Sequence, residues 1–315
     1  MTRSQVFGAD RGGTRARLPR MMLAAVTAGL LLPASGEAAV TIGSDLGRAP
    51  TTAPVCSPAG CTLALAGLPV GFRAPGGLTS PVNGTINVWR VRSGGGSPSA
   101  ALRVVRPFAG GLFRGAGTSN PPGIGGAGIN TFSAALPIAI GDQIGVDSSV
   151  GNVLRPHPSS LTALFDPPLA NGGPGRSPNV FNARELALNA TIEPTSAVSV
   201  RKAKRRKKGK LRVVVNLPNP GTLIAGDKRD AKTGATTAAK KKKKKLLKRK
   251  RIEVGGPGKR GFTLKPTKFA RKLLKARFLR TGNKKAKIKV RVRLAFIPAF
   301  GTTRGIATKK TKLRR

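Results

Sequence analysis

The densest concentration of reactive side chains is a run of cations in the C-terminal third of the chain. The run consists of Lys240, Lys241, Lys242, Lys243, Lys244, Lys245, Lys248, Arg249, Lys250 and Arg251. Ammonium and guanidinium groups neutralise anionic polymers, and contacts of this kind hold a phosphate backbone without reading a base sequence. The run is therefore predicted to bind polyanions, and it is our candidate binding site.

The distribution of charge extends this prediction to the whole C-terminal third. The chain has 58 Lys and Arg against 11 Asp and Glu, and 43 of the cations lie from residue 196 onward. Such an excess repels itself, so it has to be solvated or neutralised by anions. Three interpretations stay open: a solvated charged surface, a site for anionic envelope polymers or membrane head groups, and a nucleic-acid-binding region.

Nucleic-acid binding is the less favoured of the two binding interpretations. Single-stranded nucleic acids are held by cations interleaved with aromatic side chains on which the bases stack. The aromatic residues nearest the run are Phe262, Phe269 and Phe278, and they fit a hydrophobic core better. The run is also a poor amphipathic membrane helix, because Leu246-Leu247 is its only apolar element.

Side chains suited to catalysis are scarce. The single histidine, His157, lies between two prolines, and a Ser or Cys nucleophile needs such a base beside it. A carbohydrate-binding or carbohydrate-active first domain is an alternative, because glycosidases use a pair of carboxylates. We nevertheless expect no catalytic, cofactor or metal site. The carboxylates available for such a pair are Asp45, Asp142, Asp147, Asp166, Glu185 and Glu193.

The two cysteines, Cys56 and Cys61, are separated by four residues. An isolated pair in an oxidising compartment predicts a disulfide, whereas a metal site needs about four ligands. The segment Gly123–Gly128 matches G-x-G-x-x-G, but a dinucleotide site needs a strand before it and a helix after it. Because Asn120-Pro121-Pro122 precedes the segment, we predict a glycine-rich loop.

The N-terminus has the features of an export signal, which we assign to residues 1–38. Five arginines precede the apolar stretch Met21–Leu32, and Gly36-Glu37-Ala38 is a small-x-small cleavage pattern. Twelve residues are too few for a helix to cross about 30 Å of hydrocarbon. We therefore expect a cleaved signal peptide, no spanning segment in the mature chain, and a secreted or cell-surface protein.

Short apolar runs between turns organise residues 39–195. Two such runs around Gly141-Asp142 predict a hairpin, and the apolar residues from Leu186 to Ile192 alternate onto one face. About eight strands without a helical period predict a β-sandwich of the jelly-roll type. The predicted strands are Thr62–Leu68, Gly84–Arg92, Ala101–Arg106, Asn130–Ala135, Pro137–Ile140, Gln143–Asp147, Leu161–Phe165 and Glu185–Glu193.

Residues 196–210 are a basic stretch that we predict to be a linker, since blocks of like charge are usually solvated. A second domain, residues 211–315, then begins with the strand Leu211–Leu217, for which Thr222–Ala225 is the expected hairpin partner. Residues 226–251 are predicted to be a flexible basic segment.

The rest of the second domain contains one predicted helix and two predicted strands. Helical spacing over Pro266–Leu279, with Thr267 as the cap, predicts the helix. Alternation of apolar and basic residues over Lys287–Leu294 predicts a strand with a charged outer face, and residues 302–313 a final strand.

Residues 41–195 contain a series of spaced short motifs. They are Leu78-Thr79-Ser80-Pro81 with Gly84, the strand around Trp89, Leu102–Pro107, Asn130-Thr131-Phe132 and Gly141–Gly145. These motifs resemble those of a group of exported actinobacterial proteins. The resemblance implies export and a β-sandwich that follows the signal peptide, with a cysteine-bounded turn near its start. It brings no catalytic residues with it.

The C-terminal region has its own set of spaced residues, Pro220-Gly221-Thr222, Leu264, Pro266, Ala270, Leu274, Pro298, Gly301 and Thr302. With these residues it resembles the immunoglobulin-like or fibronectin-type modules that end such proteins, although the run from Lys240 to Arg251 is heavier than in those modules. We thus expect an all-β protein, with a jelly-roll-like sandwich followed by a smaller immunoglobulin-like sandwich. Its expected role is structural or binding, and the sequence does not indicate its oligomeric state.

Overall fold

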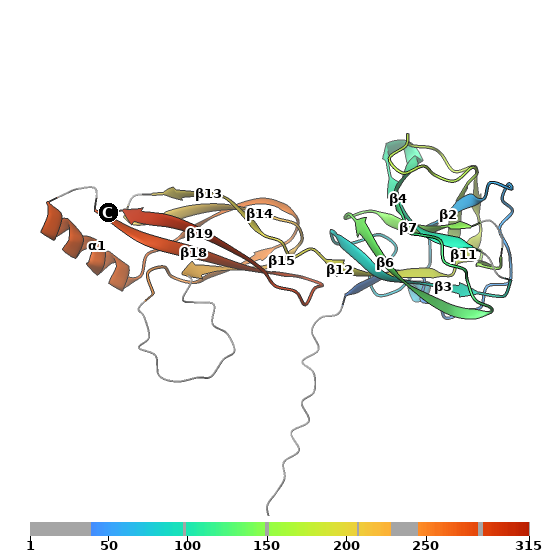
Figure 1. Cartoon of the computed structure of the whole chain (residues 1–315), viewed down its shortest axis with the longest axis horizontal. Helices are drawn as coiled ribbons and strands as arrows, with labels where there is room; N and C mark the ends of the chain where they lie inside the picture. The colour runs from blue at the N-terminus through green and yellow to red at the C-terminus, as the bar shows by residue number, and fades with distance from the viewer. Residues whose placement is uncertain are drawn as a thin grey trace, which may run out of the picture. The chain divides into compact units, whose positions relative to one another are not determined.

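The computed structural model describes residues 39–96, 99–148, 151–206, 208–227, 245–282 and 286–314 (Figure 1). The expected signal peptide and the lysines from Lys240 to Lys244 lie outside these ranges. The described chain forms antiparallel β-sheets and the helix α1 (Lys268–Thr281), which confirms the all-β prediction. No helix within these ranges is long and apolar enough to span a membrane.

Strands β1 to β12 build the first sandwich. One sheet has the order β1-β12-β3-β6, a six-stranded sheet has the order β10-β9-β2-β7-β4-β5, and β8 pairs with β11. The strands are β1 (Val40–Gly43), β2 (Cys61–Gly67), β3 (Gly84–Ser93), β4 (Ala100–Pro107), β5 (Phe113–Thr118), β6 (Gly128–Ile138), β7 (Gln143–Ser148), β8 (Leu154–Pro156), β9 (Leu161–Phe165), β10 (Val180–Asn182), β11 (Arg184–Leu186) and β12 (Leu188–Pro194).

The pairing order of the main strands is that of a jelly roll. If β1 to β7 and then β12 are counted as strands one to eight, one sheet runs 1-8-3-6 and the other contains 2-7-4-5. Two Greek keys wound in this way place most consecutive strands in opposite sheets. Strands β8 to β11 are an insertion before the last strand, and β9 and β10 widen the second sheet. The predicted disulfide joins Cys56 to Cys61, the first residue of β2.

The predicted hairpin at Gly141-Asp142 is wrong, because the chain crosses between the two sheets there. β6 pairs with β3, whereas β7 pairs with β2 and β4. The Asp142 carboxylate accepts hydrogen bonds from Ala139 N at 2.9 Å and from Arg106 Nε and Nη2 at 2.7 Å. These bonds to Asp142 raise the pKa of Arg106 and fasten the crossing to β4.

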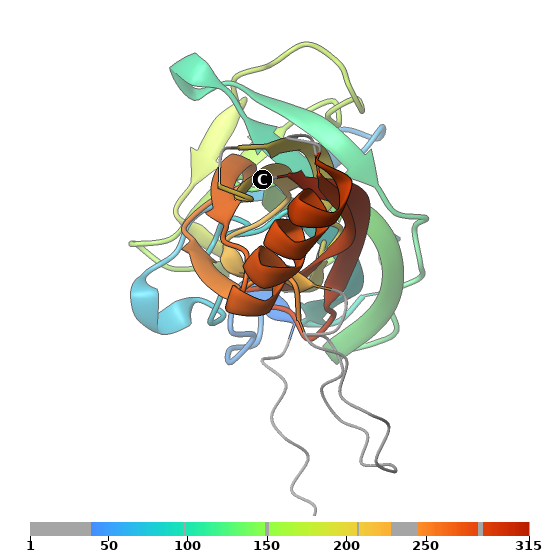
Figure 2. The same ribbon diagram turned by 90° about the vertical axis from the view of Figure 1, so that its left-hand side faces the viewer.

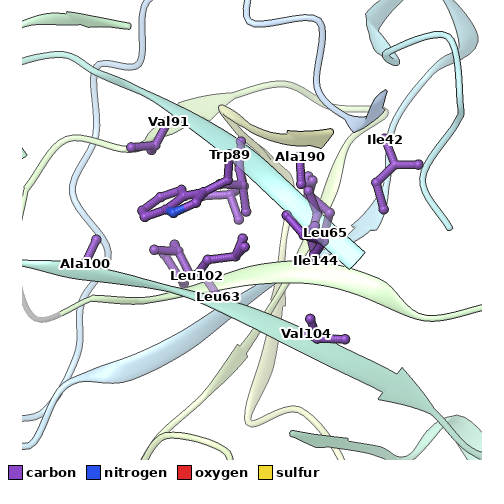
Figure 3. Packing of buried hydrophobic residues seen from close by; sticks show 14 of the residues in the cluster. Ile42, Leu63, Leu65, Trp89, Val91, Ala100, Leu102, Val104, Ile144 and Ala190 are labelled. Atoms are coloured by element: carbon purple, nitrogen blue, oxygen red, sulfur yellow. The ribbon is translucent and has the colours of Figure 1, made fainter. Parts of the chain in front are cut away.

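The first core lies between the two sheets around Trp89, which is completely buried. Figure 3 shows its ring facing Leu63 and Leu102 from the opposite sheet, and the ring of Phe132 lies 4.7 Å away between centroids. Leu186, Leu188, Ala190 and Ile192 are fully buried, as predicted, but Ala187 and Asn189 between them are buried as well, so the expected half-buried strand is wrong. The chain distributes the predicted residues over β11 and β12.

Strands β13 to β19 build the second sandwich. Its two sheets have the orders β13-β14-β17 and β16-β15-β18-β19, a division of strands that immunoglobulin-like sandwiches of the fibronectin type share. Helix α1 connects β17 to β18, and Thr267 Oγ1 accepts a hydrogen bond from Ala270 N, so the predicted cap is confirmed. The strands are β13 (Ser199–Arg205), β14 (Leu211–Leu217), β15 (Gly221–Asp227), β16 (Lys250–Val254), β17 (Gly258–Leu264), β18 (Lys287–Pro298) and β19 (Gly305–Arg314).

The linker prediction for residues 196–210 is wrong, because β13 occupies most of this stretch and pairs with β14. Val200 and Ala203 pack against the second core while the cations between them stay exposed. The block of like charges indicated a solvated linker, so the sequence did not predict these apolar contacts. Lysines on an edge strand also discourage pairing with other chains.

Two further expectations for the second domain are corrected. Leu211–Leu217 and Thr222–Ala225 do not form a hairpin, because β14 and β15 belong to different sheets. The predicted flexible segment, residues 226–251, is structured in its described part. Leu246 and Leu247 are buried in the second core, and β16 begins at Lys250.

Hydrogen bonds around two asparagines join the first sandwich to the second. The Asn83 backbone N–H donates to Asn219 Oδ1 at 2.6 Å, and Asn219 Nδ2 donates at 2.8 Å to the carbonyl oxygens of Asn83 and Thr195. Asn219 is completely buried, so its amide group satisfies backbone groups that would otherwise be unpaired.

Substitution Leu102→Ala is expected to lower the free energy of unfolding of the first sandwich by about 2–5 kcal/mol, because it leaves a cavity beside Trp89. Trp89 is the only tryptophan, so its fluorescence during chemical denaturation reports on this sandwich. The matched control is Leu161→Ala on β9, where the side chain is 44% exposed. Equal losses for the two variants would contradict the assigned core.

Candidate polyanion-binding surface

The described part of the predicted cationic run is anchored to the fold. Lys245, Lys248, Arg249, Lys250 and Arg251 are exposed. Between them, Leu246 N donates to the Asp227 carboxylate at 3.1 Å, and Lys248 N donates to Lys265 O at 2.9 Å. The apolar pair that interrupts the run thus ties it to the second core, and its cations point outward.

Arg251 is partly neutralised within the protein. Its Nε donates to Glu253 Oε1 at 2.7 Å, and Thr222 Oγ1 donates to the other carboxylate oxygen at 2.7 Å. The hydrogen bond from Thr222, and then that from Arg251, lower the pKa of Glu253. Both side chains of the ion pair are largely exposed, so it contributes little to stability.

A second group of cations lies on the outer face of β18 and β19. We call this group the cation ladder. Residues directly opposite each other in an antiparallel pair project from the same face. The facing pairs of the ladder are Lys287 with Arg314, Lys289 with Lys312, and Arg291 with Lys310.

The inner face of β18 is apolar, whereas on that side β19 places Lys309 opposite Val292 and Thr311 opposite Val290. Ile288, Val290, Val292 and Leu294 are buried in the second core, which confirms the orientation predicted for this strand. Phe296 continues the apolar side and is completely buried. The ladder is therefore fixed on the surface by the packing of the residues that alternate with it.

No described carboxylate forms an ion pair with the cation ladder. The acidic residues that the structure describes in the second sandwich are Asp227 and Glu253. Asp227 is 4% exposed and stands opposite Val292, and Glu253 is paired with Arg251. Like charges placed directly opposite each other are destabilising, so the ladder has a cost that none of the described carboxylates offsets.

The outer face of the other sheet carries fewer facing cations. Lys204 stands opposite Arg212, but Lys202 stands opposite Val214 and Lys259 opposite Asn216. Repulsion from Lys202 in the first place, and from Arg206 and Arg212, lowers the pKa of Lys204. The positive potential thus extends around the sandwich, but cations face each other more often on β18 and β19.

Helix α1 adds cations at one end of the second sandwich, next to the C-terminal end of β19 (Figure 2). Ala270 and Leu274 are its buried residues. Arg277 Nη1 donates to the carbonyl oxygen of Lys287, the first residue of β18, at 3.0 Å. This contact places the helix beside the first pair of the ladder. The exposed cations of α1 include Lys268, Arg271, Lys272, Lys275 and Arg280.

The carboxylates considered for a glycosidase pair have structural partners. Asp147 forms an ion pair with Arg103, and Arg48 donates to Glu185, which is 1% exposed. These bonds hold loops and strands of the first sandwich together. The remaining contacts are Asp45 with Gly47 N, Asp142 with Arg106, Asp166 with Ser57, and Glu193 with Thr303.

The structure brings together one serine–histidine pair that the sequence analysis did not identify. Ser160 Oγ lies 3.1 Å from His157 Nδ1 within a turn in which Ser160 N also donates to His157 O. Ser160 is completely buried, so its hydroxyl fastens the turn and faces no solvent. The Pro-His-Pro-Ser-Ser sequence is the signal for this turn.

Comparison with protein-family models and with the curated proteins gave no match for this chain. No cluster of three or more potential metal ligands occurs among the described residues. The segment Gly123–Gly128 is a loop that leads into β6, as predicted, and Ile124 inserts into the first core. The exposed cations of the second sandwich are therefore the feature from which we infer a function.

Substitution Lys312→Glu is expected to raise the free energy of unfolding by a few tenths to about 1 kcal/mol at low ionic strength, because it removes repulsion with Lys289. Concentrated salt should reduce this gain by screening. Thermal unfolding followed by circular dichroism measures it. The control, Lys259→Glu, makes the same change in net charge opposite Asn216, and an equal gain there would exclude a specific cost of the facing pair.

Proposed function

We propose that this chain is an exported, non-catalytic binding protein whose second sandwich attaches it to anionic polymers of a cell envelope or of the extracellular space. The observation that carries the proposal is the cation ladder, in which Lys289 faces Lys312 and Arg291 faces Lys310 without a described carboxylate beside them. A polyanion would remove this repulsion on binding, so part of the binding free energy comes from relief of an unfavourable contact.

Export is supported by the N-terminal sequence and by the disulfide between Cys56 and Cys61. Disulfides persist in oxidising compartments and are rare in the cytosol. The resemblance to exported actinobacterial proteins points to the same location. In this proposal the first sandwich is the body that is displayed, and the second sandwich holds it on the surface.

The export proposal predicts that the mature protein begins near Ala39 and is recovered outside the cytoplasmic membrane. Cell fractionation followed by N-terminal sequencing measures both properties, because signal removal accompanies translocation. A cytoplasmic enzyme assayed in the same fractions serves as the control for leakage. Recovery of a cytoplasmic chain that still carries residues 1–38 would contradict export.

Binding to a polyanion is expected to weaken steeply with salt, because each neutralised anion releases counterions. Replacement of Lys240–Lys244 by serine should weaken binding to dextran sulfate only partly, since the cations of both sheets and of α1 remain. The measurement is a titration of the mature chain at several salt concentrations, with uncharged dextran as the control. Complete loss of binding in this variant would show that the run itself is the site.

A further inference from the structure

The cation ladder has a regular succession of facing cation pairs, whereas on the other described sheet Lys204 faces Arg212 but Lys202 faces Val214. Its pairs occur at every second residue of β18, and two residues of an antiparallel strand span about 6.8 Å. Within a pair the two backbones are about 5 Å apart. The ladder therefore presents two parallel rows of positive charge along a straight line, three steps long.

Protection of a sheet edge does not account for this arrangement. Cations that prevent edge pairing are needed on the outermost strand, which here is β19. β18 pairs with β15 from Val292 onward, whereas its residues Lys287, Lys289 and Arg291 pair with β19. Edge protection does not require cations on β18 to stand directly opposite cations on β19, and these facing pairs add repulsion.

The spacing matches polymers that carry one phosphodiester for every six backbone bonds. A peptide has three backbone bonds per residue and extends by about 3.3–3.6 Å per residue, so six single bonds of an extended chain span about 7 Å. Poly(glycerol phosphate) has six backbone bonds between successive phosphorus atoms. Polymers of sugars with one carboxylate per two rings place their charges farther apart.

We infer that the cation ladder is a binding track for a linear polyol phosphate, with the polymer axis parallel to β18 and one phosphate at each pair of cations. This inference rests on the proposed function and names its ligand class. Each phosphodiester carries one negative charge and two free oxygens, so a facing pair of cations can bind both oxygens. Arginine adds a fork that matches this geometry, and Arg291 and Arg314 supply it at two of the three steps.

Arg293, the next outer-face residue of β18, provides a second observation. Its Nε is buried and has no hydrogen-bond partner within the part of the chain that the structure describes. An unsatisfied buried donor is costly, and a guanidinium next to the third step of the ladder can rotate toward a phosphate there. Arg293 stands opposite Thr308 rather than another cation, so the track ends at this residue.

Single-stranded nucleic acids share the phosphodiester spacing, but the ladder lacks what their bases require. Base recognition by such surfaces depends on aromatic side chains that stack on the bases. The outer face of β18 from Lys287 to Arg293, and of β19 from Thr308 to Arg314, carries no aromatic residue. A polymer without bases therefore fits the track better.

The test compares two variants of the mature chain with identical changes in composition. The track variant replaces Lys289, Arg291, Lys310 and Lys312 by serine, and the control variant replaces Lys202, Lys204, Arg212 and Lys259 on the other sheet by serine. Each loses three lysines and one arginine, and none of these side chains is buried. Circular dichroism verifies that both variants fold.

The ligand in the test is purified poly(glycerol phosphate), and the dissociation constant is measured at low and moderate salt. We expect the track variant to bind at least tenfold more weakly than the control variant. Equal weakening of the two variants would overturn the track while leaving charge-driven attachment in place. Failure of the unmodified chain to bind any polyanion at low salt would overturn the proposed function itself.

Two further ligands test whether the ladder prefers a polyol phosphate to a nucleic acid or to a carboxylated polysaccharide. Oligo(dT) with the same number of phosphates should bind with an affinity within a few-fold of that of poly(glycerol phosphate). The two polymers share the spacing of their phosphates, and we expect the bases to make no additional contact. Tighter binding of oligo(dT) by more than tenfold would show that bases contribute and would overturn the polyol assignment. Hyaluronate, with its wider carboxylate spacing, should bind more weakly than poly(glycerol phosphate), and equal affinity would overturn the match of spacing.

Discussion

Alternation of side chains along β18 is the constraint on which the second sandwich depends. Successive residues project to opposite faces of a strand, so Ile288, Val290 and Val292 enter the core while the lysines and arginines between them face solvent. Full burial of such an apolar side chain contributes about 1.5–3 kcal/mol, and a facing pair of like charges costs about 0.2–1 kcal/mol. The core therefore prevails, and the fold tolerates a surface charge that would keep a less regular sequence unfolded.

The same constraint makes the sheet a better support for binding than its charge alone suggests. β18 pairs with β19 along the whole ladder, so the backbones of Lys289 and Arg291 are held before a ligand arrives. Ordering of side chains and loops is a main cost of association. The backbone of a residue on a paired strand is already ordered, so binding adds no further loss of backbone entropy there. In the described end of the cationic run, Arg251 is paired with the acidic residue Glu253. This ion pair weakens the attraction of Arg251 for an external anion.

The sequence predicted which side chains are buried better than it predicted which strands pair with each other. The burial of Leu186, Leu188, Ala190 and Ile192 and the cap at Thr267 follow from local spacing, and both are confirmed, although the predicted single strand is divided between β11 and β12. The hairpin at Gly141-Asp142 failed because a period of two tells which side of a strand is apolar, but not which strand lies beside it. The linker prediction failed because the charges of Arg201–Lys210 outweighed Val200 and Ala203, whose contacts with the core appear only when the sheet is assembled.

The candidate site shows the same limit. Composition draws attention to the place where cations are dense along the chain, but a polyanion meets cations that are dense on a surface. Lys289 and Lys312 become neighbours only through the register of β18 with β19, which no local pattern specifies. β18 alternates cations with apolar residues from Lys287 to Arg293, and β19 alternates them with uncharged residues from Lys310 to Arg314, so the sequence alone shows two separate rows of cations. What joins them is the requirement that Ile288 and Leu313 face each other in one core, and that packing turns two separate charge patterns into facing pairs.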